Sequence, residues 1–189
     1  MRQRWHYNCA VSIYTRSGDD GETGLFDGTR LSKSDPLIEA CGEVDELDAV
    51  LGLVLAHLTE PDLIEIITHV QRDLFAIGAR LADPRRRIAE RITKVDLDGR
   101  AVERLESWID RFDEELPEMR QFILPGGTPA GASLHLARSV CRRVERRIVA
   151  LGSDVVERAV RVYINRLSDL LFMLARAVNT RAKMPETEW

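Results

Sequence analysis

The chain has 189 residues, of which 44% are hydrophobic and 31% charged, so it fits one globular domain and not a disordered chain. Its formal net charge of −4 argues against a nucleic-acid-binding protein. No apolar run reaches the roughly 18 residues that a membrane span needs, which argues against a membrane protein.

The N-terminal part contains a predicted loop. We expect residues 1–10 to form a disordered leader in front of a single domain over residues 11–189. Ser17 to Gly24, continued by Asp27-Gly-Thr, is too rich in glycine to form a helix. Such loops present backbone N–H groups to anions, although most of them are merely turns. The sequence has neither a Walker A motif nor a dinucleotide-binding GxGxxG motif here, but Lys33 follows closely enough to reach a phosphate.

The rest of the chain is predicted to be helical. Apolar residues recur at helical spacing in five segments, and no strand pattern is convincing. The predicted helices run from Pro36 to about His57, from Pro61 to a break at Asp83-Pro84, from about Asp96 to Glu115, from about Ala130 to Leu151, and from a cap at Gly152–Asp154 to about Thr180. Long helices with short connections predict an all-α bundle.

Five arginines and one acid occur between Arg138 and Arg147. A helix turns about 100° per residue, so these charges divide between faces. One arc of roughly 100° holds Arg138, Arg142, Glu145 and Arg146, with His135 beside them, whereas Arg143 and Arg147 lie on another side. An ordinary solvated face with an Arg142–Glu145 ion pair is one interpretation. Because one glutamate cannot pair with three guanidinium groups, binding of a phosphate or carboxylate ligand is the other.

The last predicted helix has a second polar face. Asn165, Asp169, Phe172 and Arg176 share it, opposite an apolar stripe. Periodicity leaves open whether this face is a polar rim or lines a pocket.

The three cysteines show no CxxC spacing. A sparse, odd set favours a reducing compartment and argues against a disulfide framework or a zinc site, so we expect a cytoplasmic protein.

Taken in chain order, these segments resemble the PduO-type ATP:cob(I)alamin adenosyltransferases, the corrinoid adenosyltransferase family. Four blocks in the family's order carry the resemblance. They are Ile13-Tyr-Thr-Arg-Ser-Gly-Asp-Asp-Gly21 with Thr23 and Lys33, Gly42-Glu-Val-Asp-Glu-Leu-Asp-Ala49, Phe122-Ile-Leu-Pro-Gly-Gly127 continuing into Arg138–Arg147, and Tyr163-Ile-Asn-Arg-Leu-Ser-Asp-Leu-Leu-Phe172.

The resemblance implies a ferritin-like up-down five-helix bundle that assembles as a homotrimer, with active sites between subunits. It also implies an enzyme in which Co(I) of the corrinoid attacks C5′ of ATP and triphosphate leaves. Mg²⁺ is then expected to bind mainly through the ATP phosphates, and the metal ligands in the chain stay unknown. A corrinoid reductase and a cobalamin-dependent enzyme are the transient partners that such a reaction implies.

Residue roles carry over from the resemblance position by position. The implied ATP-binding residues are Thr15, Arg16, Ser17, Gly18, Thr23, Gly24, Lys33, Arg142, Arg143, Glu145, Arg146 and Asn165. Arg142, Glu145 and Arg146 are the implied catalytic residues. The implied corrinoid pocket contains Phe122, Phe172 and Asp169, where Phe122 fills the lower face of the corrin and leaves Co(II) four-coordinate. Asp45 and Arg138 match a salt bridge across the subunit interface.

Two positions depart from the family pattern. Ser17 stands where threonine is usual, and Asp48 stands where asparagine is usual, which adds negative charge beside Asp45. Two other functions remain open: a bundle that binds nucleotide or corrinoid without turnover, and a structural protein whose arginine face is only an oligomer interface.

Overall fold

The computed structural model describes residue 14, residues 16–83 and residues 99–189. Within these residues two short strands come first and five helices follow. The elements are β1 (Glu22–Gly24), β2 (Arg30–Ser32), α1 (Pro36–His57), α2 (Pro61–Leu81), α3 (Gly99–Glu115), α4 (Pro129–Ala150) and α5 (Arg158–Arg181). The bounds predicted for the first, second and fourth helices are confirmed to within two residues, whereas the predicted start of the third lies outside the described residues.

Local signals in the sequence explain where α1 and α4 begin. The Asp35 carboxylate accepts a hydrogen bond from the backbone N–H of Leu37 at 2.8 Å, and a proline occupies the first turn of α1. The Thr128 hydroxyl accepts from the N–H of Gly131 at 3.0 Å, and α4 also begins with a proline. Because the first helical N–H has no partner within the helix, proline costs nothing there, and each cap fixes a helix start.

The start of α5 differs from the prediction. The sequence predicts a cap at Gly152–Asp154, but α5 begins only after Glu157, whose side chain makes no capping hydrogen bond. The N–H of Val156 donates instead to the carbonyl of Gly152 at 3.2 Å and closes a turn. Since the Val156 side chain is buried, burial of an apolar residue shapes this connection in place of the predicted cap.

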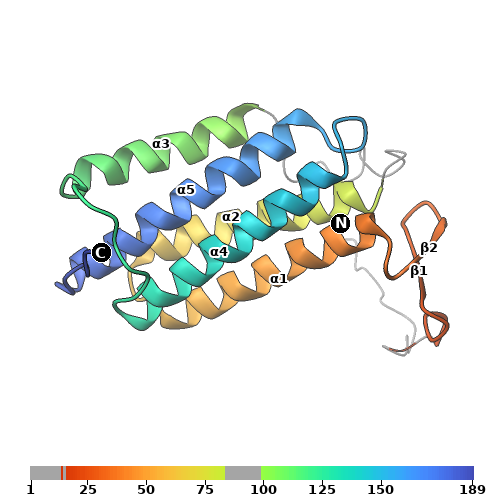
Figure 1. Cartoon of the computed structure of the whole chain (residues 1–189), viewed down its shortest axis with the longest axis horizontal. Coiled ribbons are helices and arrows are strands. Elements are labelled where there is room, and N and C mark those ends of the chain that lie inside the picture. The colour runs from red at the N-terminus through yellow and green to blue at the C-terminus, as the bar shows by residue number, and fades with distance from the viewer. Residues whose placement is uncertain (1–13, 15, 84–98) are drawn as a thin grey trace, which may run out of the picture.

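Successive helices run in opposite directions, and α4 lies between α1 and α5 (Figure 1). Ion pairs show the antiparallel register of α1 and α4, because Glu39 in the first turn of α1 pairs with Arg147 in the last turn of α4 at 2.5 Å. Likewise, the side-chain amide of Asn165, in the first half of α5, donates to Glu145, in the second half of α4, so these two helices are also antiparallel. The expected up-down bundle is confirmed.

Apolar stripes at helical spacing form the core of the bundle. In α1 the buried residues are Ala40, Val44, Leu47, Leu51 and Val54. A fully buried Leu or Val contributes about 1.5–3 kcal/mol, whereas an exposed ion pair contributes about 0–1 kcal/mol. The stripes therefore hold the bundle together, and most outward arginines are not needed for its stability. None of the described helices combines the length and apolarity that crossing a membrane requires.

One charged cluster interrupts this core between α2, α3 and α5. The Asp73 side chain is fully buried, and one of its carboxylate oxygens accepts from the Tyr163 hydroxyl and from Arg104, each at 2.8 Å. His69 lies 3.8 Å from the other oxygen. Burial, followed by the charge of Asp73, raises the pKa of Tyr163. Sequence reasoning missed this cluster, because Arg104 and Tyr163 are 31 and 90 residues from Asp73 along the chain.

The loop before α1 contains a two-stranded antiparallel ribbon, in which Glu22 pairs with Ser32 and Gly24 with Arg30. The prediction of no strand is therefore wrong for this short segment, since strands of three residues are too short to show a period. The ribbon rests on the end of α2, where the N–H of Phe26 donates to the Ala82 carbonyl at 3.3 Å.

Candidate functional site

The antiparallel register of α4 and α5 brings together the predicted site residues of both helices. Asn165 lies beside Glu145, and Phe172, about two turns further along α5, lies beside His135 and Arg138. The polar faces predicted for the two helices therefore line one common surface, which we call the α4–α5 surface. Arg176 is the exception, because it is buried and donates to Glu186 and to the Pro117 carbonyl.

Glu145 is the centre of the α4–α5 surface. One carboxylate oxygen accepts from the Asn165 side-chain amide at 2.8 Å, and the other lies 2.6 Å from a guanidinium nitrogen of Arg142. The second contact is an ion pair without hydrogen-bond geometry, because that oxygen has no hydrogen-bond partner among the described residues. The Glu145 side chain is 17% exposed and that of Arg142 is 46% exposed. Glu145 therefore holds Arg142 in place and leaves it accessible to a ligand.

The three other arginines between positions 143 and 147 differ in their contacts. Arg146 has no hydrogen bond or ion pair with any other residue that the structure describes. Arg147 and Arg143 turn toward α1, where Arg147 pairs with Glu39 and Arg143 with two glutamates, Glu43 at 2.5 Å and Glu46. The predicted division of these arginines between faces is confirmed. Contact of Arg143 with a nucleotide stays a prediction, because its guanidinium binds α1 in this chain.

Aromatic groups occupy the middle of the α4–α5 surface. The Phe172 ring centre lies 6.1 Å from that of His135 and 5.5 Å from the guanidinium carbon of Arg138. The sequence places His135 on the charged face, but its side chain is only 6% exposed. Burial, followed by the charge of Arg138, lowers the pKa of His135 and favours the neutral imidazole. Asp169 is exposed and lies 3.8 Å from Arg166.

The Gly-rich loop packs Lys33 against Gly18. A Cβ atom at Gly18 would lie 3.3 Å from the Lys33 ammonium nitrogen and 3.2 Å from the Glu22 carbonyl oxygen, so the approach favours glycine. Arg30 donates to the Ser17 carbonyl at 2.6 Å and to the Glu22 carboxylate at 3.0 Å. Two cations thus stand beside exposed loop backbone, which suits an anionic ligand.

The other predicted loop residues lie close by. Arg16 has a φ of 61°, an uncommon conformation for a residue other than glycine, and its guanidinium lies 5.6 Å from the centre of the Tyr14 ring. Thr23 and Gly24 belong to β1. Thr15 lies outside the described residues.

The loop and the arginines share one end of the bundle. The loop leads directly into α1, whose first turn meets the last turn of α4, and Figure 1 shows the ribbon at this end. Within the described residues, however, no hydrogen bond or ion pair joins the loop to Arg142 or Arg146. A ligand bound by both would itself have to supply the link between them.

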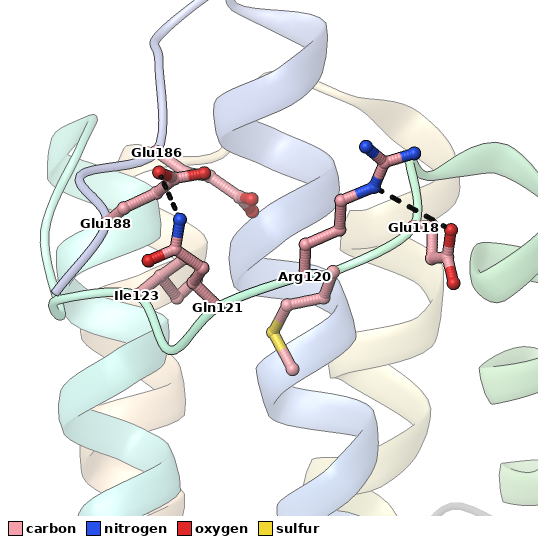
Figure 2. Close-up of a pocket in the computed structure, with 7 residues that line it drawn as sticks. Glu118, Arg120, Gln121, Ile123, Glu186 and Glu188 are labelled. Atoms are coloured by element: carbon pink, nitrogen blue, oxygen red, sulfur yellow. Dashed lines mark hydrogen bonds and ion pairs between the residues drawn. The ribbon is translucent and has the colours of Figure 1, made fainter.

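Phe122 lies on the connection between α3 and α4, and its side chain is 78% exposed. The chain end pairs with this connection, because the N–H of Trp189 donates to the Phe122 carbonyl at 2.9 Å. Figure 2 shows a surface pocket beside it, where the Gln121 amide donates to Glu188 at 3.0 Å. The residues lining this pocket are not among the predicted site residues.

The predicted pair of Asp45 and Arg138 does not form within the chain. Asp45 is exposed on α1 and has no ion pair with any described residue, while Arg138 lies over Phe172. A bridge across an interface needs a second subunit, so it stays a prediction. Asp48, the unusual acid nearby, has its pKa raised mainly by burial and further by the charge of Asp45.

A preformed metal site is not found in the described part of the chain, since no group of three or more His, Cys, Asp or Glu side chains there could hold an ion. A Mg²⁺ ion that is bound through nucleotide phosphates does not require such a group.

The comparisons with known proteins decide the family. A family model described as cobalamin adenosyltransferase matches residues 13–178. The chain belongs to the cobalamin adenosyltransferase family. A curated cobalamin adenosyltransferase of Cupriavidus metallidurans is 42% identical over 187 residues, which cover 96% of each chain. A corrinoid adenosyltransferase of Bacillus subtilis is 40% identical over 184 residues, covering 95% of this chain and 92% of that protein.

Solved structures of adenosyltransferases share the fold. A variant of the PduO-type ATP:corrinoid adenosyltransferase from Lactobacillus reuteri, in complex with cobalamin and ATP, has a TM-score of 0.85 and 35% sequence identity. The match covers 94% of this chain and 99% of that one. The resemblance stated from the sequence and the bundle seen here are therefore both confirmed.

Sequence reasoning missed three residues that make contacts at or near the candidate site. Arg166 donates to the Asn165 side-chain oxygen at 3.3 Å and to Glu106 at 2.8 Å, which links α5 to α3. Arg30 secures the loop, and Asn179 binds the connection that follows Phe122. The one available signal was the pair Gly126-Gly127 before a helix, because adjacent glycines often mark a close approach of another group.

Proposed function

We propose that this chain transfers the 5′-deoxyadenosyl group of ATP to the cobalt of cob(I)alamin or a related corrinoid, forms adenosylcobalamin and releases inorganic triphosphate. Membership of the family supports this function, as do relatives about 40% identical along nearly the whole chain. A similar solved structure in complex with cobalamin and ATP supports both substrates.

The observation that carries the proposal is the excess of positive charge beside Glu145. Glu145 neutralises only part of it through Arg142, and Arg146 is left without a partner among the described residues. Guanidinium groups bind phosphate oxygens in a bidentate manner, so these two arginines fit a triphosphate. The Gly-rich loop, with Lys33 against Gly18, adds a further cation for the same ligand.

The proposed reaction needs no nucleophile from the protein. The cobalt of the corrinoid supplies the electron pair, a Co–C bond forms at C5′ of ATP, and the C5′–O bond breaks. The electrons of that bond leave with triphosphate, whose negative charge rises as the bond lengthens. Fixed guanidinium groups directed at this charge lower the barrier, which is the catalytic role proposed for Arg142 and Arg146. Glu145 and Asn165 orient Arg142 and the nucleotide, and a bound Mg²⁺ would neutralise further phosphate charge.

We propose that the active site lies between subunits of a homotrimer. The loop and Arg142 share no hydrogen bond or ion pair among the described residues, and in the proposed assembly the loop of a neighbouring subunit joins Arg142 on one ATP. Exposed apolar side chains on α1 and α4, at Leu53, Leu136 and Val149, supply apolar surface for such contacts. Asp45 and Arg138 are the pair proposed to join two subunits. Light scattering should therefore give about three times the chain mass of 21.4 kDa.

The aromatic residues are proposed to receive the corrinoid. Phe122 presents an exposed ring on the connection between α3 and α4, and Phe172 and Asp169 lie along α5. A phenyl ring against the lower face of the corrin leaves no room for an axial base, so Co(II) would stay four-coordinate and easier to reduce. A reductase that supplies the electron and a cobalamin-dependent enzyme that accepts the product are the proposed transient partners. The sparse cysteines support a cytoplasmic location as a proposal.

The test is an anaerobic assay with ATP, Mg²⁺ and chemically reduced cobalamin, in which the visible spectrum follows loss of Co(I). The proposal expects ATP-dependent conversion to adenosylcobalamin well above the rate without protein. Binding of ATP and corrinoid without conversion would instead indicate a carrier or sensor. No affinity for ATP at all would indicate that the arginine face is only an interface.

A further inference from the structure

The Asn179 side chain, near the end of α5, binds the connection between α3 and α4 at three points. Its amide nitrogen donates to the Gly126 carbonyl at 3.0 Å. Its oxygen accepts from the N–H of Thr128 at 2.9 Å and from the Thr128 hydroxyl at 3.0 Å. Asn179 is only 5% exposed. A buried amide with this many partners is costly to replace, since each backbone group it satisfies would lose its partner.

Two glycines make room for this amide. Gly127 has a φ of 99°, and a Cβ atom there would lie 2.3 Å from the Asn179 amide nitrogen. A Cβ atom at Gly131 would lie 2.2 Å from the Asn179 oxygen. Real Cβ atoms do not approach other atoms so closely, so both positions require glycine while Asn179 is present. The turn at 126–128 and the amide therefore form one packed unit.

The backbone of Asn179 also leads to the other side of the same connection. Its carbonyl accepts from the N–H of Met184 at 2.9 Å, where the chain leaves α5 and turns back. The returning segment then pairs with the connection, through Leu124 N–H to the Thr187 carbonyl at 2.8 Å and Trp189 N–H to the Phe122 carbonyl at 2.9 Å. The backbone of Phe122 therefore lies between two segments that Asn179 orders. The Asn179 side chain fixes the turn at 126–128, and its backbone carbonyl binds the start of the returning segment at 184–189.

We infer that Asn179 is a positioning residue for the corrinoid half of the reaction: it fixes the backbone that presents Phe122, without touching either substrate. The Phe122 ring is mostly exposed, so its place is set by its backbone and not by packing of the ring. The contacts of Asn179 lie at the start of α4, and Arg142 is 14 residues or about 20 Å further along the helix. Loss of Asn179 should therefore affect the corrinoid and spare ATP. This inference rests on the proposed function.

The test compares Asn179→Leu with Val178→Ala, which also removes buried side-chain atoms from the last turns of α5 but leaves the connection untouched. For Asn179→Leu we expect KM for cob(II)alamin, reduced in the assay, to rise by about tenfold or more, and KM for ATP to change by less than about twofold. The absorbance signature of four-coordinate Co(II) in the complex with ATP should fall in the same proportion. Val178→Ala should lower the melting temperature but leave the ratio of KM for cob(II)alamin to KM for ATP as it is in the wild type.

A readout without substrate separates this inference from the proposed function. Hydrogen exchange at the amides of Leu124 and Thr128 should accelerate by about tenfold or more in Asn179→Leu and not in Val178→Ala. A wild-type protein that does not adenosylate corrinoid overturns the proposed function, while this exchange experiment still reports whether Asn179 orders the connection. If Asn179→Leu does not fold, Gly127→Ala perturbs the same turn from the loop side. Unchanged exchange, or equal rises in KM for ATP and corrinoid, overturns the inference.

Discussion

Arg146 and Arg147 are neighbours in the sequence, and they provide a matched test of the arginine face. Arg146 has no partner among the described residues, whereas Arg147 pairs with Glu39 at 2.5 Å and lies 4.0 Å from Glu43. Arg146→Ala and Arg147→Ala remove the same side chain and the same charge. Both variants therefore weaken the long-range electrostatic attraction of an anionic nucleotide by a similar amount. They differ only in which face of α4 loses its arginine.

The structure sets the expected magnitudes. A hydrogen bond to a charged group contributes about 1.5–3 kcal/mol, so Arg146→Ala should lower kcat/KM for ATP by about 10- to 150-fold. Its free energy of unfolding should change by less than about 0.5 kcal/mol, because no described partner is lost. Arg147→Ala should lose about 0–1 kcal/mol of stability with its exposed ion pair and keep kcat/KM within about twofold.

Steady-state kinetics with varied ATP and saturating corrinoid, together with urea unfolding, check both variants. If Arg147→Ala loses as much activity as Arg146→Ala, ATP is attracted by net charge and not bound by one face of α4. If neither variant loses activity, the arginine face is not the triphosphate site.

Three further predictions concern other parts of the molecule. Phe122→Ala should leave stability and KM for ATP unchanged, because the ring is 78% exposed, but should slow the reaction when the supplied corrinoid is Co(II); equal activity from Co(II) and Co(I) would contradict its role. Burial lowers the pKa of His135 below its unfolded value of about 6.5. The neutral ring therefore contributes stability above about pH 6.5, and this stability is lost as the pH falls through the pKa of the folded protein. The free energy of unfolding should therefore fall more between pH 7.5 and pH 5 in the wild type than in His135→Gln. An equal fall in both proteins would refute the claim that His135 is buried in its neutral form. Asp73→Ala should lower the free energy of unfolding by about 2–4 kcal/mol, because it leaves the Tyr163 hydroxyl and Arg104 without their shared carboxylate; a loss under about 1 kcal/mol would show that the cluster is dispensable.

Local patterns in the sequence were enough to predict most of the bundle. Helical spacing alone separates Arg142 and Arg146 from Arg143 and Arg147, since the direction of each side chain depends only on the helix turn. The cap at Asp35 is likewise local, because its carboxylate and the N–H it binds are two residues apart. The cap at Thr128 is equally local but was not predicted. The resemblance to the family supplied what spacing cannot, namely the substrates.

The features that sequence reasoning missed depend on contacts between distant segments. His135 falls on the charged arc of an isolated helix, but in the bundle it is buried and its ring contacts Phe172 of α5. Asp73 and Tyr163 are 90 residues apart, and Asn179 lies 51 residues after Thr128, so no local pattern connects either pair. In the proposed homotrimer the Gly-rich loop meets Arg142 of a neighbouring subunit, and the helical spacing within one chain cannot predict a contact between subunits.

The central claim is that the α4 arginines hold triphosphate as a leaving group and not as a phosphoryl donor. Phosphorus NMR of a single-turnover reaction with ATP, Mg²⁺ and cob(I)alamin measures this directly. The account predicts one inorganic triphosphate for each adenosylcobalamin formed, with no ADP. Formation of ADP and phosphate, or of pyrophosphate in place of triphosphate at the earliest times, would contradict it.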